Sequence, residues 1–299
     1  MDKVVKLKPV IKSYIWGGNY FQKYFANNAE KISELWVLSN RENNSALIDS
    51  GNDKGKALNE VISEKDVGPI QDRFSYFPLL IKLIDAKDNL SVQVHPSDDY
   101  ALKNENSYGK TEMWHVIDAD EGSGIYIGLN SDYTKEEIKD SLDDGSILNK
   151  LNFFKVKKGD TYLINAGTIH AIGKGVRLIE IQQNSDLTYR LYDYKRKDKD
   201  GNYRELHIDK AIKVIDCHKY DVKQNHSDLL ADTKFFHVER KEFNGDFELT
   251  ADKSFVSFTF LDGEGMVDDI PFKKFETFFL PYGKKCQIHG SGLVIISRV

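Results

Sequence analysis

Apolar and polar residues alternate over many short stretches of this chain, a period-two pattern that is typical of half-buried β-strands. The clearest case runs from Leu90 to Pro96, where Leu, Val and Val alternate with Ser, Gln and His. Because residues two apart share one face of a strand, Ser91, Gln93 and His95 should point to one side, with an apolar row behind them. Pro96 has no N–H to donate to a sheet, so the strand should end there.

Similar patterns recur on both sides of a polar stretch that runs from Asp216 to Thr233 and that we interpret as a linker. Before it, the predicted strands are 4–7, 11–16, 35–38, 46–49, 77–85, 113–117, 123–129, 153–156, 161–164, 176–182 and 189–194. After it they are 235–240, 247–249, 255–262, 274–280, 286–289 and 293–297. Turn signals at Asp262-Gly263, Tyr282-Gly283 and His289-Gly290 separate the later strands.

Helix signals are fewer and lie before the linker. Thr134 and Glu137 form a capping box, which predicts a helix that ends near Leu142. Further short helices are predicted over 56–61, 68–74, 99–104, 146–151 and 207–214. Many short strands with regular turn signals indicate a β-sandwich or jelly roll. We therefore expect a mainly β protein, with a helix-decorated domain over 1–232 and a small β domain over 233–299.

Composition and charge exclude several classes of partner. The 299 residues carry a formal net charge of −5, which argues against nucleic acid or an anionic membrane, since both need a basic footprint. A local cluster of Lys and Arg could still bind an anionic sugar phosphate. The most apolar stretch, 77–84, is too short to cross a bilayer. Only Cys217 and Cys286 are present and the first residues lack the apolar core of a signal peptide, so we expect reduced thiols and a cytoplasmic location.

Metal-ligating residue types lie on the predicted strands. Gln93 and His95 share a strand face, and Glu112 and His170 could complete the shell. This mixed nitrogen and oxygen set suits Zn²⁺, with Fe²⁺, Mn²⁺ or Co²⁺ as alternatives. Spacing alone cannot bring these residues together, and a His in a β-rich protein is more often a structural or surface group. His115 lies three residues after Glu112, on the opposite strand face, and is interpreted as structural.

Two cations stand out from the surface charges. Lys110 lies two residues before Glu112 and should share its strand face. Arg190 lies within Leu-Thr-Tyr-Arg-Leu-Tyr, a stretch that should be buried. A cation in a half-buried strand needs an anionic partner, either a carboxylate such as Asp186 or the phosphate of a substrate.

Together these segments resemble the type I mannose-6-phosphate isomerase family, in its short bacterial and archaeal form. The matching segments are Tyr14 to Gly18, Glu34 to Trp36, Leu90 to Pro96, Lys110 to Glu112, Gly167 to His170 and Ile179 to Tyr194. Longer members carry His-Lys-Pro-Glu where this chain has Gly109-Lys-Thr-Glu112, so an acid–base role for that missing His cannot apply here.

The resemblance implies two cupin-like jelly rolls, the first one catalytic, and the metal-dependent interconversion of mannose 6-phosphate and fructose 6-phosphate. The implied site consists of one Zn²⁺ or other divalent metal on Gln93, His95, Glu112 and His170, with Arg190 and Lys110 as catalytic residues and Ser91 near the substrate phosphate. Lys110 could act as a base after desolvation or bind phosphate as a cation.

Two other function classes remain open at this point. A cupin metal oxygenase would use a similar shell of His and Glu ligands, but it needs room for dioxygen and no group that binds phosphate. A non-catalytic cupin that binds a sugar phosphate would keep the fold and lose the catalytic cations. The role of the metal is also open, since it could act as a Lewis acid or only order the site.

Overall fold

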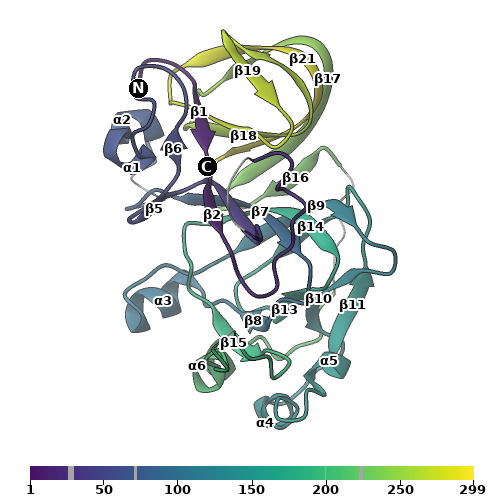
Figure 1. The fold of residues 1–299 in the computed structure, drawn as a ribbon. Coiled ribbons are helices and arrows are strands. Elements are labelled where there is room, and N and C mark those ends of the chain that lie inside the picture. The colour runs from purple at the N-terminus through teal and green to yellow at the C-terminus, as the bar shows by residue number, and fades with distance from the viewer. Residues whose placement is uncertain (26–29, 71–72, 199, 222–224, 226) are drawn as a thin grey trace.

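The computed structural model describes residues 1–25, 30–70, 73–198, 200–221, 225 and 227–299. It consists of two β-units, one above the other in Figure 1, and the helices α3 to α6 lie at the far end of the lower unit. The predicted mainly β fold, with cupin-like jelly rolls and short helices on the first, is confirmed.

The lower unit is built from two antiparallel sheets whose inner faces enclose a cavity. The six-stranded sheet contains, in order, β12 (Thr161–Ile164), β9 (Glu112–Ala119), β14 (Val176–Gln183), β7 (Leu79–Ala86), β3 (Glu34–Leu38) and β2 (Val10–Lys12). The five-stranded sheet contains β11 (Leu151–Lys155), β10 (Gly124–Leu129), β13 (His170–Ile172), β8 (Val92–Val94) and β15 (Tyr189–Tyr192).

The upper unit is an eight-stranded sheet that curls around its own core (Figure 1). Its strands, in order, are β16 (Leu229–Asp232), β17 (His237–Thr250), β21 (Lys285–Arg298), β18 (Val256–Val267), β20 (Thr277–Leu280), β1 (Val5–Lys8) and β6 (Leu47–Ile48), with β19 (Ile270–Lys273) beside β18. Because β1, β6 and β16 precede residue 233, the predicted boundary at 232 does not coincide with the sheets. A two-stranded ribbon, β4 (Asn40–Arg41) and β5 (Asn44–Ser45), completes the strands of the described residues.

Two predicted turns lie inside long strands. Gly263 is within β18 and Gly290 is within β21, where the sequence predicted chain reversals. Both residues have positive φ, and a Cβ on Gly263 would lie 1.9 Å from the Ser291 carbonyl oxygen. The glycines therefore let the backbones of neighbouring strands approach closely where the sheet bends, so that this part of the predicted turn pattern is wrong. The turn at Tyr282-Gly283 is present.

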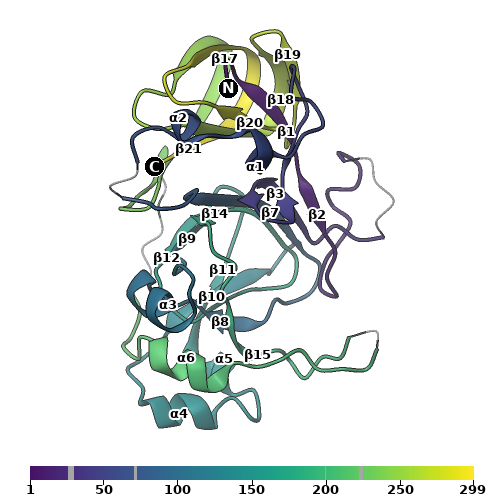
Figure 2. The ribbon, with the colours of Figure 1, turned by 90° about the vertical axis from the view of Figure 1, so that its left-hand side faces the viewer.

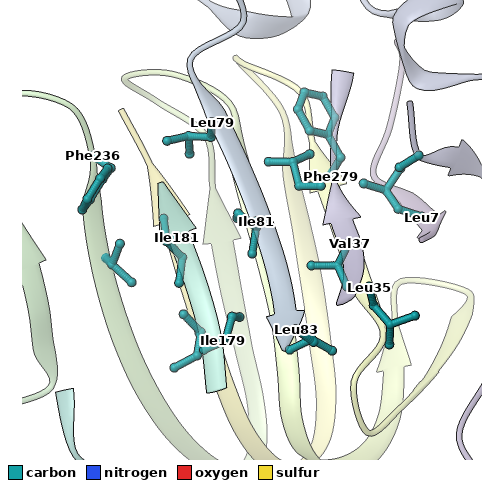
Figure 3. Close-up of a cluster of buried hydrophobic side chains, with 14 of the residues drawn as sticks. Leu7, Leu35, Val37, Leu79, Ile81, Leu83, Ile179, Ile181, Phe236 and Phe279 are labelled. Atoms are coloured by element: carbon teal, nitrogen blue, oxygen red, sulfur yellow. The ribbon is translucent and has the colours of Figure 1, made fainter. Parts of the chain in front are cut away.

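An apolar layer joins the two units (Figure 3). From the six-stranded sheet, Ile81 and Leu83 of β7 and Ile179 of β14 belong to the same buried cluster as Phe279 of β20 in the upper unit. All eight residues of β7 are buried, since its other face lines the inside of the lower unit. This explains why β7 reads as a nearly continuous apolar run in the sequence rather than as an alternating one.

The helices are short, and most of them cover the outside of the five-stranded sheet (Figures 1 and 2). They are α1 (Leu58–Val61), α2 (Glu64–Val67), α3 (Asp98–Asn104), α4 (Lys135–Asp140), α5 (Ile147–Lys150) and α6 (Ile208–Val214). The predicted capping box is confirmed, since the Glu137 N–H donates to Thr134 Oγ1 at 3.1 Å. The helix predicted over 68–74 does not form in the described part of that range, which excludes 71–72. No helix of the described residues is long and apolar enough to span a membrane.

Candidate metal centre and active site

The polar stripe that the sequence predicts on β8 points into the lower unit. Ser91 and Gln93 line a cavity of about 310 Å³ between the two sheets, and His95 lies at the end of the stripe. Val92 and Val94 belong instead to the apolar cluster beneath the helices. The alternation of faces along this strand is therefore as expected, and it carries three of the predicted site residues to the interior.

His95, Glu112 and His170 converge from the two facing sheets. His95 Nε2 lies 3.7 Å from Glu112 Oε2, and His170 Nε2 lies 3.3 Å from Glu112 Oε1. All three side chains are buried, and their possible ligand atoms lie within 4.8 Å of one another. His170 pairs with Gln93 across β13 and β8, which places the Gln93 side chain on the same face of the sheet.

The hydrogen bonds of the two imidazoles fix which nitrogen faces the interior. The Nδ1 of His95 lies 2.9 Å from the Leu187 carbonyl oxygen, and that of His170 lies 2.9 Å from the Thr168 carbonyl oxygen. Because a carbonyl can only accept, each Nδ1 carries the proton and each Nε2 presents a lone pair. Both Nε2 atoms and Glu112 Oε1 are buried without a hydrogen-bond partner in the described part of the chain. Buried acceptors that face one another without partners suit a bound cation. Metal-ligating histidines usually donate the N–H of their other ring nitrogen to a carbonyl or carboxylate, as both histidines do here.

Burial sets the protonation of this group. Desolvation lowers the pKa of His95 well below its usual value and lowers that of His170 to about 4, which keeps both rings neutral. Desolvation also raises the pKa of the Glu112 carboxyl, and the neighbouring Glu180 charge raises it further. Neutral imidazoles can bind a metal without releasing a proton, whereas the raised pKa of Glu112 favours its protonated form, from which metal binding displaces a proton.

A buried network of charges adjoins the three candidate ligands. The Lys110 ammonium lies 2.8 Å from Glu112 Oε2 and 3.7 Å from Glu180 Oε1, and Lys82 Nζ donates to Glu180 Oε1 at 2.9 Å. Burial alone would raise the pKa of Glu180, but Lys110 and Lys82 outweigh it and hold that pKa well below the usual range. The predicted position of Lys110 beside Glu112 is thus observed, and each lysine is opposed by a carboxylate.

Arg190 lies on β15, next to Gln93 of β8, and lines the same cavity. Its Nη1 donates to the Glu205 carbonyl oxygen at 2.7 Å, whereas its Nε is buried without an acceptor among the described residues. Asp186, one of its two expected partners, is engaged by Arg41 instead, at 2.8 Å. Desolvation lowers the pKa of the Arg190 guanidinium, as does the nearby Arg204 charge. No carboxylate forms an ion pair with Arg190 within the described chain, so its charge has no anionic partner there.

Several residues of the cavity wall were missed in the sequence or only hinted at. Tyr14 and Trp16 stack with ring centroids 5.4 Å apart and form an aromatic wall. Lys82 could have been found, because it interrupts the apolar stretch 77–84. Arg204 had no signal, since it lies in a charged segment that reads as an exposed loop.

His115 is outside the site, as expected. Its Nδ1 bonds to Thr161 Oγ1 at 2.8 Å, on the outer face of β9. There it borders a larger cleft of about 950 Å³ between the two units, whose charged residues include Arg240 and Asp262. Among the described residues, the only cluster of three or more His, Cys, Asp or Glu with metal-like spacing is His95, Glu112 and His170.

Comparison with known proteins gives a consistent picture. A family model described as the catalytic domain of type I phosphomannose isomerase matches residues 4–117. The mannose-6-phosphate isomerase ManA of Bacillus subtilis is 38% identical, over 98% of this chain and 98% of the relative. A mannose-6-phosphate isomerase of Streptococcus mutans is 37% identical, over 89% of this chain and 87% of the relative.

Solved structures agree with the sequence comparison. The crystal structure of the mannose 6-phosphate isomerase from Bacillus subtilis matches with a TM-score of 0.90 and 32% identity, covering 100% of both chains. A phosphomannose isomerase variant from Salmonella typhimurium is 15% identical and matches with a TM-score of 0.80 over 99% of each chain. This more distant match shows a shared fold.

Proposed function

The chain belongs to the type I phosphomannose isomerase family, and from this premise we propose that it interconverts mannose 6-phosphate and fructose 6-phosphate with a bound divalent metal. Members of this family are aldose–ketose isomerases, and the motifs in the sequence indicated the same class of enzyme for this chain. We propose that Gln93, His95, Glu112 and His170 hold the metal. The oxygenase and the non-catalytic binding protein, the two other classes that the sequence left open, are not favoured by these relatives.

The observation that carries this proposal is the set of buried, unpartnered acceptors. Two imidazole Nε2 atoms and a carboxylate oxygen face one another, and leaving them desolvated without a partner is costly. A mixed nitrogen and oxygen set is typical of Zn²⁺, and Zn²⁺ is the metal that we propose, one per chain. When bound, a divalent cation here supplies positive charge that stabilises negative charge on the oxygens of the reacting sugar.

The protein's own cations have distinct places in the proposed reaction. Isomerisation moves the carbonyl between C1 and C2, so a proton must move between these carbons and an enediolate must be stabilised. Lys110 lies between Glu112 and Glu180 and lines the cavity, and we propose that it takes part in proton transfer. Arg190, on the next strand from Gln93, provides a fixed positive charge for the enediolate. Ser91 lines the same wall and is proposed to contact the substrate.

An isomerase assay with and without a chelator tests this proposal. Purified protein should convert fructose 6-phosphate to mannose 6-phosphate, lose that activity on chelation, and regain it when Zn²⁺ is added back. Chelator-sensitive oxygen consumption without isomerisation would indicate an oxygenase, and sugar-phosphate binding without turnover would indicate a binding protein. We also propose a cytoplasmic location, which the two free cysteines support.

A further inference from the structure

A second arginine, Arg204, lines the cavity near Arg190. His170, Gln93 and Arg190 are side by side on the successive strands β13, β8 and β15. The chain returns beside β15, where the His207 N–H donates to the Arg190 carbonyl oxygen at 2.7 Å. This return brings Arg204 to the cavity wall near Arg190.

A buried carboxylate holds Arg204 in this place. Its Nε donates to Asp193 Oδ2 at 2.8 Å, and its Nη2 donates to Asp193 Oδ1. Such a fork fixes the plane of the guanidinium, which a single hydrogen bond would not do. Its Nη1 makes no hydrogen bond within the described chain, so one edge of Arg204 is available to a ligand. The Asp193 side chain is only 6% exposed, and these contacts hold the pKa of its carboxyl below the usual value although burial opposes this.

The cavity wall around Arg190 and Arg204 has more positive charge than the wall beside the three candidate ligands. Beside these ligands, Lys82 and Lys110 are each opposed by a carboxylate. Around the two arginines, Asp193 is shared between Arg204 and Arg196, while Arg190 has no carboxylate partner in the described chain. Three other carboxylates lie nearby and are largely exposed, so that water screens them. Glu205 and Asp88 are 82% and 54% exposed, and Asp186, which also lines the cavity, is 58% exposed and already pairs with Arg41.

The order of groups along the cavity matches the order of groups in the substrate. A hexose 6-phosphate carries its reacting carbons, C1 and C2, at one end and its phosphate at the other. The row from His170 through Gln93 leads to Arg190, and Arg204 lines the cavity near Arg190. A sugar bound with C1 and C2 near the ligand cluster and extended along this row would place its phosphate beside the two arginines. A phosphate monoester carries a charge of about −1.5 to −2 at neutral pH and is well matched by the planar fork of an arginine.

We propose that Arg204, oriented by Asp193, binds the phosphate of the substrate and makes this enzyme selective for phosphorylated sugars. Asp193 is then a positioning residue, which acts through Arg204 and does not touch the substrate. This inference rests on the proposed function of the cavity, to which it adds a residue for the non-reacting end of the sugar.

Steady-state kinetics of Arg204→Gln test the inference. We expect KM for mannose 6-phosphate to rise by about 10- to 100-fold while kcat stays within about threefold, because the lost contact is far from the reacting carbons. Competitive inhibition by inorganic phosphate should weaken by a similar factor. Asp193→Asn should shift KM in the same direction, and Arg204→Lys should recover part of the loss by keeping the charge.

Arg196→Gln is the matched control, because Arg196 also bonds to Asp193 but does not line the cavity. Its KM should stay close to that of the wild type. Unchanged KM and unchanged phosphate inhibition in Arg204→Gln would overturn the inference, as would an equal KM rise in Arg196→Gln. If Arg204→Gln does not fold, as judged by its melting temperature, Asp193→Asn takes its place in the comparison, and an unchanged KM in that variant would overturn the inference.

Phosphate binding, measured as a rise in melting temperature, tests this inference separately from the proposed function. A wild-type protein without isomerase activity would refute the proposed function. Inorganic phosphate should nevertheless raise the melting temperature of the wild type and of Arg196→Gln, but not that of Arg204→Gln. Equal stabilisation of all three by phosphate would overturn the role of Arg204 whatever the activity.

Discussion

The two β-units have related architectures, but the interior of the lower unit is polar and that of the upper unit is apolar. Inside the lower unit lie charged or metal-ligating side chains, among them Lys82, Glu112 and Glu180. Inside the upper unit the corresponding space is filled by phenylalanines: Phe258 and Phe278 stack with planes 9° apart, in the same cluster as Phe260 and Phe272. The upper unit therefore has an ordinary apolar core, whereas the lower one has a cavity.

This difference shows that the inward-facing residues, and not the strand arrangement, decide which unit can perform chemistry. Burying charged groups is costly unless they are paired, so the lower interior is unfavourable for stability alone. Such a cost is expected at a functional site, and buried groups with perturbed pKa values cluster at such sites. We propose that the upper unit contributes stability and no ligands, and the variants below test this division from the largest expected effect to the smallest.

Removing one proposed ligand should abolish the function of the lower unit. His95→Ala takes away a buried Nε2 that faces Glu112, so we expect loss of the metal and a fall in kcat of about 10³-fold or more. Metal analysis of the folded variant, together with the isomerase assay, measures this. Full metal occupancy in folded His95→Ala would show that the assigned ligand set is wrong.

Removing Arg190, which has no carboxylate partner among the described residues, should affect turnover and leave the metal in place. Arg190→Ala is expected to lower kcat by about 10²- to 10³-fold, the range seen when one stabilising donor is lost from a transition state. Its melting temperature and metal content should remain near those of the wild type. A near-normal kcat with only a higher KM would make Arg190 a binding residue instead.

A substitution that creates a cavity in the upper unit should lower the stability of the protein and leave catalysis unchanged. Phe258 is fully buried, so Phe258→Ala should lower the free energy of unfolding by about 3–5 kcal/mol. Urea unfolding measures the loss, and kcat of the folded protein at low temperature should stay near normal. If the variant lost its metal while still folded, the two units would not be separable in this way.

The cleft between the units should contribute a pH dependence to stability. Burial lowers the pKa of His115 to about 4, while the unfolded chain has a pKa of about 6.5 at this residue. Between these values the unfolded state binds a proton that the folded state does not, so stability falls as the pH falls through this window. The free energy of unfolding should therefore fall between about pH 7 and pH 4, and His115→Gln should make this fall smaller by up to about 3 kcal/mol. Unfolding free energies at both pH values measure it, and an unchanged slope would contradict the assignment.

The histidines of the upper unit should have the smallest effect. His237 lies near Asp232 and Glu239, and His289, which is 71% exposed, pairs with Asp246. His237→Ala and His289→Ala should therefore keep the metal and stay within about threefold of wild-type activity, as typical surface substitutions do. Loss of metal in either variant would show that the upper unit enters the site and would end the proposed division of labour.

The sequence by itself determined the local features of this protein. Period-two alternation assigned Ser91, Gln93 and His95 to one face of β8, and the spacing of Lys110 and Glu112 placed them on one face, because both follow from the pleat of a strand. The cap of α4 also followed from Thr134 and Glu137 alone. The family motifs then indicated that these residues form one site.

Only the tertiary structure decided which distant residues meet. Alternation states which way a side chain points, but not which strand lies across from it, so the sequence could not show that Lys82 pairs with Glu180 or that Arg41 engages Asp186. It also could not distinguish a glycine at a turn from Gly263 within a bent strand. Arg204 reaches the cavity only because its segment folds back beside β15. These outcomes depend on sheet topology and on contacts between residues far apart in the chain, which a local pattern does not contain.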